Sequence, residues 1–180
     1  MSVFQEDTFD CVIRLIKAGY KNPVALDFAS GTNPGGSWRS KQQGTQEESL
    51  CRRSDLGLLL EKKKYPIPTD SYHYLPKVII TNANISCAIM ASELRSITAR
   101  TEEYLIKRIS CLYECAIKNK HDVIVLGAWG CGAFKETDDD AQIMAKIFKI
   151  VSKKYIGSIT SVYAVLHKTN YEIFKKNIDE

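Results

Sequence analysis

Segments with helical periodicity alternate with short β-branched runs along the whole chain, and this alternation restricts the fold more than any other feature. In the helical segments, apolar residues recur at intervals of three or four positions, which places them on one face. Strands separated by helices of this length form a mixed or parallel sheet with helices on both faces. We therefore predict a three-layer α/β fold with a central mixed sheet, whose ligand site lies at the carboxyl ends of the strands.

The boundaries of the expected elements follow from periodicity and from turn residues. Gly19 supplies a stop for the first helix, and Pro66 and Pro68 end the second. The run KVIITN is interpreted as a buried strand, whereas the segment that follows it has no clear pattern. The expected helices are 8–18, 45–64, 101–119, 140–154 and 170–177, and the expected strands are 24–28, 77–82, 123–126 and 161–166.

Length and composition are those of an ordinary globular domain. The chain has 180 residues, of which 44% are hydrophobic and 26% charged, so we expect a single domain over residues 1–180 that folds without disulfides or metals. No apolar run approaches the roughly 20 residues that a membrane span needs, and the acidic N-terminus lacks the pattern of a signal peptide. We therefore expect a cytoplasmic or nuclear protein without a membrane partner.

Cysteine usage and charge restrict the partners further. Six cysteines are scattered without a C-x-x-C pair, and in a reducing compartment we expect them to be free thiols without disulfide partners. The net charge of +4 comes with short lysine clusters, which usually mark exposed ends of elements and do not indicate a nucleic-acid surface. A mildly positive surface would still favour a ligand that carries phosphates.

The first glycine-rich loop, Asn33-Pro34-Gly35-Gly36-Ser37, follows an expected strand and precedes an expected helix. Small residues at this place let the backbone approach a ligand and let several N–H groups point into one concavity, which suits a diphosphate. The loop is not a P-loop, because no G-K-[ST] follows, and it lacks G-x-G-x-x-G. Taken alone, the two glycines also fit a tight turn.

The second loop, 127–134 (GAWGCGAF), carries three glycines within six residues directly after an apolar strand. A plain turn seldom needs so many. A loop that wraps phosphates does need this freedom, and Trp129 or Phe134 would offer a flat apolar face to a ribose or a base.

The triplet Gln46-Glu47-Glu48 opens the helix after the first loop and admits two interpretations. Thr45 and Glu48 fit a capping box, in which the glutamate reaches back to the helix start. An acid held beside a phosphate loop would also face a sugar attached to that phosphate. Neighbouring helical residues diverge by about 100°, so the two glutamates cannot flank one bond and one must act alone. The three histidines show no metal spacing, and we expect neither metal nor cofactor.

Taken together, residues 25–56 (ALDFASGTNPGGSWRSKQQGTQEESLCRRSDL) and 123–134 (VIVLGAWGCGAF) resemble the microbial poly(ADP-ribose) glycohydrolase family, which has the macrodomain fold. That family's signature is three glycines, a spacer of six to eight residues, and Gln-Glu-Glu. Here Gly35-Gly36-Ser37, eight residues and Gln46-Glu47-Glu48 occupy these places. The resemblance extends over most of the chain.

The resemblance implies roles for particular residues. Glu48 would be the catalytic acid, which protonates the leaving oxygen at the anomeric carbon of the distal ribose, and Glu47 would support it at the ribose hydroxyls. Asp7 and Asn170 are assigned to adenine by their position only. The remaining residues implied in binding the distal ribose and the diphosphate are Asp27, Asn33, Gly35, Gly36, Ser37, Gln46, Gly127, Trp129, Gly130, Cys131, Gly132, Ala133 and Phe134.

Two hypotheses of different class follow. The first is a hydrolase that cleaves the glycosidic bond of poly- or mono-ADP-ribose on proteins. The second is a catalytically silent macrodomain that only binds ADP-ribose. The intact triplet favours the hydrolase, whereas Ser37 in place of the third glycine and a shortened 66–78 segment favour the reader or a narrower substrate. The acidic 135–140 stretch (KETDDD) also departs from the family. A third option, a basic RNA-binding module, should bind in a strongly salt-dependent way.

Overall fold

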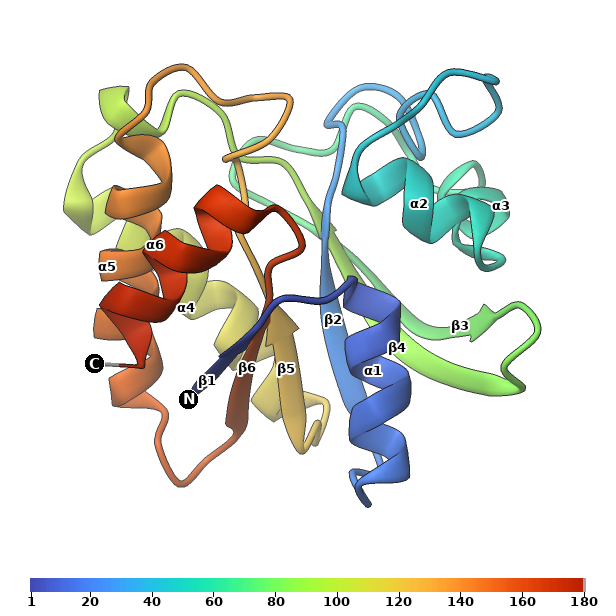
Figure 1. Ribbon diagram of the computed structural model, residues 1–180. Coiled ribbons are helices and arrows are strands. Elements are labelled where there is room, and N and C mark those ends of the chain that lie inside the picture. The colour runs from blue at the N-terminus through green and yellow to red at the C-terminus, as the bar shows by residue number, and fades with distance from the viewer. Residues whose placement is uncertain (180) are drawn as a thin grey trace.

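A six-stranded sheet forms the centre of the computed structural model, which describes residues 1–179 (Figure 1). The strands lie in the order β1-β6-β5-β2-β4-β3, and every neighbouring pair is parallel except β3 and β4, which are antiparallel. The predicted mixed sheet is therefore confirmed. The strands are β1 (Ser2–Phe4), β2 (Pro23–Phe28), β3 (His73–Ile80), β4 (Ile85–Ser92), β5 (Val123–Leu126) and β6 (Thr160–Ala164).

Helices cover both faces of the sheet, and the alternation of strand side chains gives each face its own core. In β2, Val24 and Leu26 pack against α4, α5 and α6, whereas Ala25 between them packs against α1, α2 and α3. Figure 1 shows these two groups of helices on opposite sides. The helices are α1 (Thr8–Lys17), α2 (Gln46–Arg52), α3 (Leu56–Leu60), α4 (Glu102–Lys118), α5 (Asp140–Lys154) and α6 (Lys168–Ile178), with a short 3₁₀ turn, η1 (Ile97–Ala99).

The helix predicted over 45–64 is wrong as a single element, because it divides into α2 and α3. The backbone between them pairs with the outer edge of β3. Asp55 N donates to Ile79 O (3.2 Å), and Thr81 N donates to Arg53 O (2.8 Å). Ser54 Oγ also donates to Leu50 O (2.7 Å), which closes the last turn of α2. A contact between distant segments thus overrides the local helical pattern.

The prediction of a buried strand at 77–82 also needs correction. This run belongs to β3, an edge strand in which Val78 and Ile80 are buried while Lys77 and Ile79 are exposed. Its partner, β4, was not predicted. The sequence of β4, ISCAIMAS, contains few β-branched residues, and its membership of the sheet depends on burial between two layers.

All six cysteines are free thiols in the structure. Among the helices of residues 1–179, none is long and apolar enough to cross a membrane.

Candidate active site

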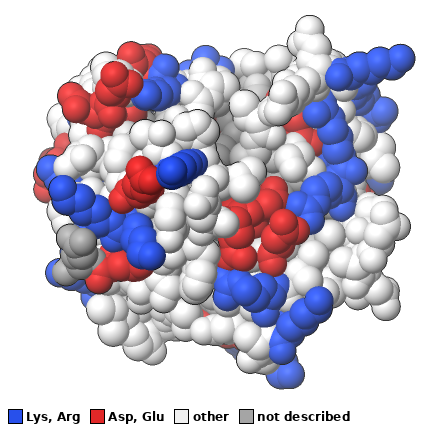
Figure 2. Space-filling model, in the orientation of Figure 1, with Lys and Arg blue, Asp and Glu red and all other residues white. Residues whose placement is uncertain are grey.

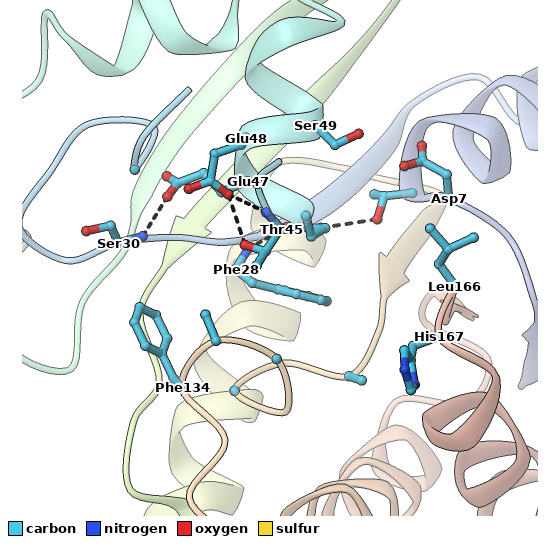
Figure 3. Close-up of a pocket in the computed structure, with 18 of the residues that line it drawn as sticks. Asp7, Phe28, Ser30, Thr45, Glu47, Glu48, Ser49, Phe134, Leu166 and His167 are labelled. Carbon is cyan, nitrogen blue, oxygen red and sulfur yellow. Dashed lines mark hydrogen bonds between the residues drawn. The ribbon is translucent and has the colours of Figure 1, made fainter. Parts of the chain in front are cut away.

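A cleft of about 990 Å³ opens at the carboxyl ends of the parallel strands. Its walls come from the loops after β2, β5 and β6, from the start of α2 and from the segment before α1 (Figure 3). The volume lies at the upper end of the range typical of small-molecule sites. Both glycine-rich loops predicted from the sequence contribute to it.

The first loop passes directly over two carboxyl groups because it has no side chain at Gly36. This residue has a φ of +60°, and a Cβ there would lie 2.4 Å from Glu48 Oε1 and 3.1 Å from Glu47 Oε2. Any other residue would displace the acids. Gly35, with a φ of +74°, does not line the cleft, since its missing side chain leaves room for Trp38.

Glu48 accepts hydrogen bonds on both carboxylate oxygens. Oε2 accepts from Thr45 N (2.8 Å) and Thr45 Oγ1 (2.9 Å), which is the reach-back contact of the predicted capping box. Oε1 accepts from Ser37 N (3.1 Å) and Ser37 Oγ (3.3 Å). Glu48 also lines the cleft, so capping and a position beside a ligand are combined in one side chain.

The hydrogen bonds decide the ionisation of Glu48. Its partial burial raises the pKa, but the donors of Ser37 and Thr45 outweigh burial and hold the pKa of Glu48 below its usual value. In the ligand-free protein at neutral pH, Glu48 is therefore a carboxylate.

Glu47 has the opposite environment. The side chain is 2% exposed, and Oε2 accepts one hydrogen bond from Ser30 N (2.8 Å), whereas Oε1 has no partner among the described residues. Burial, followed by the charge of Asp27, raises the pKa of Glu47 far above its usual range. Figure 3 shows the carboxyl groups of Glu47 and Glu48 side by side at the start of α2.

Asp27 does not line the cleft, although it was predicted to help bind the ligand. It belongs to β2, its side chain is fully buried, and both carboxyl oxygens lack partners among the described residues. Burial raises the pKa of Asp27 well above its usual range.

Gln46 anchors α2 to the sheet. Its Oε1 accepts from Phe28 N (2.9 Å) just at the end of β2, and its Nε2 donates to Leu26 O (2.8 Å) and Thr8 Oγ1 (3.1 Å). The residue borders the cleft, but its amide is occupied by protein. Gln46 thus sets the position of the two glutamates that follow it.

The second loop contributes fewer residues to the cleft than predicted. Gly130, Gly132, Ala133 and Phe134 line it, whereas Gly127, Trp129 and Cys131 do not. The expectation that Trp129 presents a face to the ligand is wrong, because its ring is buried and its Nε1 donates to Ser92 O (2.9 Å). Cys131 is buried too. Position 127 requires glycine because a Cβ there would lie only 2.6 Å from Ala164 O.

The remaining predicted residues lie around the rim. Asn33 lines the cleft, and its N–H donates to Ser30 Oγ (3.1 Å). Asp7 caps α1 through Phe9 N (2.8 Å) and pairs with Arg53 (2.5 Å). Asn170 Nδ2 donates to Cys131 O (3.5 Å), which links α6 to the second loop. Both Asp7 and Asn170 line the cleft, and their assignment to adenine stays a prediction.

Several cleft residues were not predicted. Arg95 follows β4, and its guanidinium lies 3.9 Å from the ring centroid of Phe134, so it covers one face of that ring. Figure 3 shows Leu166 and His167 across the cleft from the glutamates. Acidic and basic side chains gather next to one another on this face of the molecule (Figure 2). Further lining residues without a sequence signal are Ser30, Arg52 and Arg53.

The three-layer fold with a mixed sheet, and the cleft between two glycine-rich loops, are those of a macrodomain, and the solved structures described below share this fold. The family model of the microbial-type PARG (poly(ADP-ribose) glycohydrolase) catalytic domain matches residues 1–81. Together with the solved structures described next, this match confirms the resemblance to the microbial-type poly(ADP-ribose) glycohydrolase family.

Two solved structures illustrate the likeness. One is the poly(ADP-ribose) glycohydrolase of Deinococcus radiodurans in complex with ADP-ribose, with 25% identity and a TM-score of 0.80 over 99% of this chain and 83% of that chain. The other is the enzyme of Thermomonospora curvata bound to the inhibitor ADP-HPD, with 25% identity and a TM-score of 0.80 over 97% and 77%. No curated protein matches the chain.

Proposed function

We propose that the protein is an ADP-ribosyl hydrolase, which cleaves the glycosidic bond of poly- or mono-ADP-ribose on proteins and uses Glu48 as the general acid. The observation that carries this proposal is the position of Glu48 under the bare backbone of Gly36, at the floor of a cleft bounded by both glycine-rich loops. The two relatives described above are glycohydrolases whose structures hold ADP-ribose or an inhibitor.

The lowered pKa of Glu48 in the free protein fits this role if substrate binding raises that pKa enough for Glu48 to take up a proton from solvent. A bound diphosphate carries two negative charges, and like charges nearby favour the protonated form of a carboxyl group. Glu48 would therefore take up a proton as substrate enters. It would then donate that proton to the leaving oxygen as the glycosidic C–O bond breaks through an oxocarbenium-like transition state. Water would add to the anomeric carbon and give up a proton to the Glu48 carboxylate.

A silent ADP-ribose reader is the second candidate. The observation that favours it is the saturation of both Glu48 oxygens by Ser37 and Thr45, which would suffice if the side chain served only as a helix cap. Release of ³²P-labelled ADP-ribose from poly- and mono-ADP-ribosylated proteins separates the candidates. Release above the buffer rate establishes a hydrolase, and tight binding without release establishes a reader.

Free ADP-ribose is expected to bind and to raise the melting temperature. Ligand at about 100 times its Kd stabilises the folded state by roughly 2.7 kcal/mol. For a chain of this size that corresponds to about 5–10 °C. Differential scanning fluorimetry with ADP-ribose, and with AMP as a control for the adenine half, measures the shift. If calorimetry detected no binding at millimolar ADP-ribose, both candidate functions would be excluded.

Removal of the Ser37 hydroxyl is expected to increase turnover. Ser37→Ala and Ser37→Gly both keep the N–H donor to Glu48 Oε1 but lack the hydroxyl donor, so they make protonation of Glu48 easier. A hydrogen bond to a charged group contributes at least about 1.5 kcal/mol, so its loss predicts a gain of about tenfold. Single-turnover rates at pH 6–9 test this, and a rate decrease in both variants would assign the hydroxyl a direct role in the reaction.

A further inference from the structure

Asp27 and Glu47 together carry three buried carboxyl oxygens that lack a partner. Asp27 Oδ1, Asp27 Oδ2 and Glu47 Oε1 are all buried, and none has a hydrogen-bond partner among the described residues. Asp27 belongs to β2 and Glu47 to the start of α2, and the charge of Asp27 raises the pKa of Glu47, so the two acids are neighbours. A charged carboxylate in such a place is costly unless a cation or a hydrogen-bond donor compensates it.

Among the described residues, no positively charged group is found to act on the pair. The other titratable groups that face it are Glu48 and Cys51 on α2 and Tyr65 after α3. Each of these becomes negative when it loses its proton. Burial, reinforced by the charges of Asp27 and Glu47, raises the pKa of both Cys51 and Tyr65. Two carboxyl groups can hydrogen-bond to one another only if at least one keeps a proton. Because Ser30 N already donates to Glu47 Oε2, Oε1 is the atom available to share that proton with Asp27.

We propose that Asp27 and Glu47 retain a shared proton at neutral pH, and that Asp27 is thereby a positioning residue that keeps the acid cluster under the cleft able to accept an anionic diphosphate ligand. With the proton in place, the pair carries at most one negative charge next to Glu48. Without it, three carboxylates would lie below the ligand and repel it. The part of this proposal that concerns the ligand rests on the proposed function, whereas the shared proton does not.

The shared proton is tested first in the ligand-free protein. The pKa of each acid is raised in the folded state, so from about pH 4 upward the folded protein holds protons that the unfolded chain has lost. Stability must then fall as the pH rises, until the raised pKa is passed. Urea unfolding of wild type, Asp27→Asn and Glu47→Gln between pH 5 and 9.5 measures this slope.

Asparagine and glutamine keep the shape of the side chain but cannot take up a proton. The slope of unfolding free energy against pH is proportional to the number of protons lost on unfolding. We expect this number to be smaller by about one in each variant than in the wild type, so the slope should be shallower. All other titrating groups are common to the three proteins and cancel in the comparison. Parallel curves for wild type and Asp27→Asn would overturn the proposal. If a variant fails to fold, ¹³C NMR titration of carboxyl-labelled wild type decides, because both acids must then titrate above their usual range.

The ligand part is tested by the affinity for ADP-ribose from pH 6 to 9.5. If bound ligand raises the pKa of the Asp27–Glu47 pair, loss of the shared proton must weaken ligand binding by the same factor, because the coupling is reciprocal. Wild-type affinity should therefore fall with rising pH, by about tenfold for each unit by which ligand raises that pKa. Asp27→Asn should lose less affinity than wild type over the same range. If affinity depended on pH in the same way in wild type and Asp27→Asn, Asp27 would have no role in ligand binding. If ADP-ribose did not bind at any pH, the proposed function would fail. The unfolding curves would still test whether Asp27 and Glu47 share a proton, because they are measured without ligand.

Discussion

Glu48→Gln is expected to lower the single-turnover release of ADP-ribose by about 10²-fold or more, the usual effect of removing a general acid. Glutamine has nearly the same size as glutamate, and its amide oxygen can still accept from Thr45 N at the helix start. Binding of ADP-ribose and the melting temperature should therefore change little. Rapid-quench measurement of labelled ADP-ribose release, with binding followed by calorimetry, determines the rate and the affinity separately.

Two further variants separate catalysis from capping. If Glu48 served only as a cap, Glu48→Gln would be nearly silent in rate, and Glu48→Ala would mainly lower stability by about 0.5–2 kcal/mol. Glu47→Gln is the matched control, since it lies one position earlier in α2 and replaces a buried acid whose pKa is already raised. It should lose less than Glu48→Gln. A folded Glu48→Gln variant with wild-type release would remove Glu48 as the acid.

The residues closest to the proposed chemistry could be predicted because they form local patterns. Gly36, the Gln46-Glu47-Glu48 triplet and the glycines of the second loop are adjacent in sequence to the turns that they shape. Their placement at one edge of the sheet followed from the alternation of strands and helices. The structure places all of these residues except Gly127 around one cleft.

The errors arose where the environment of a residue depends on distant segments. Trp129 packs in the core, where its indole N–H donates to Ser92 O at the end of β4, a strand without a clear sequence pattern. Arg95 was missed for the same reason, since it follows β4. The position of Asp27 in the run VALDF does not reveal whether its carboxyl group faces ligand or core. That depends on how α2 packs over β2, which no local pattern specifies.

Gly132→Val is expected to weaken ADP-ribose binding strongly without unfolding the protein. A Cβ at Gly132 would have no neighbour within 4 Å, and its φ lies outside the left-handed region, so the folded chain can accept valine. The residue lines the cleft in the second loop, where a β-branched side chain would keep phosphate away from the backbone. We expect affinity to fall by about 10²-fold or more, or roughly 2.8 kcal/mol.

The other glycines show why Gly132 is the informative position. Gly130 also lines the cleft, but its φ of +77° and a Cβ only 2.8 Å from Ile97 Cδ1 mean that Gly130→Val should damage the fold as well as the site. Gly157 provides the reverse control, since its φ of +86° makes substitution costly although it lies outside the cleft. Gly157→Val should lower the melting temperature and leave the affinity of the folded protein unchanged. Circular dichroism and calorimetry on the three variants test this order, and wild-type affinity in folded Gly132→Val would show that the second loop does not approach the ligand.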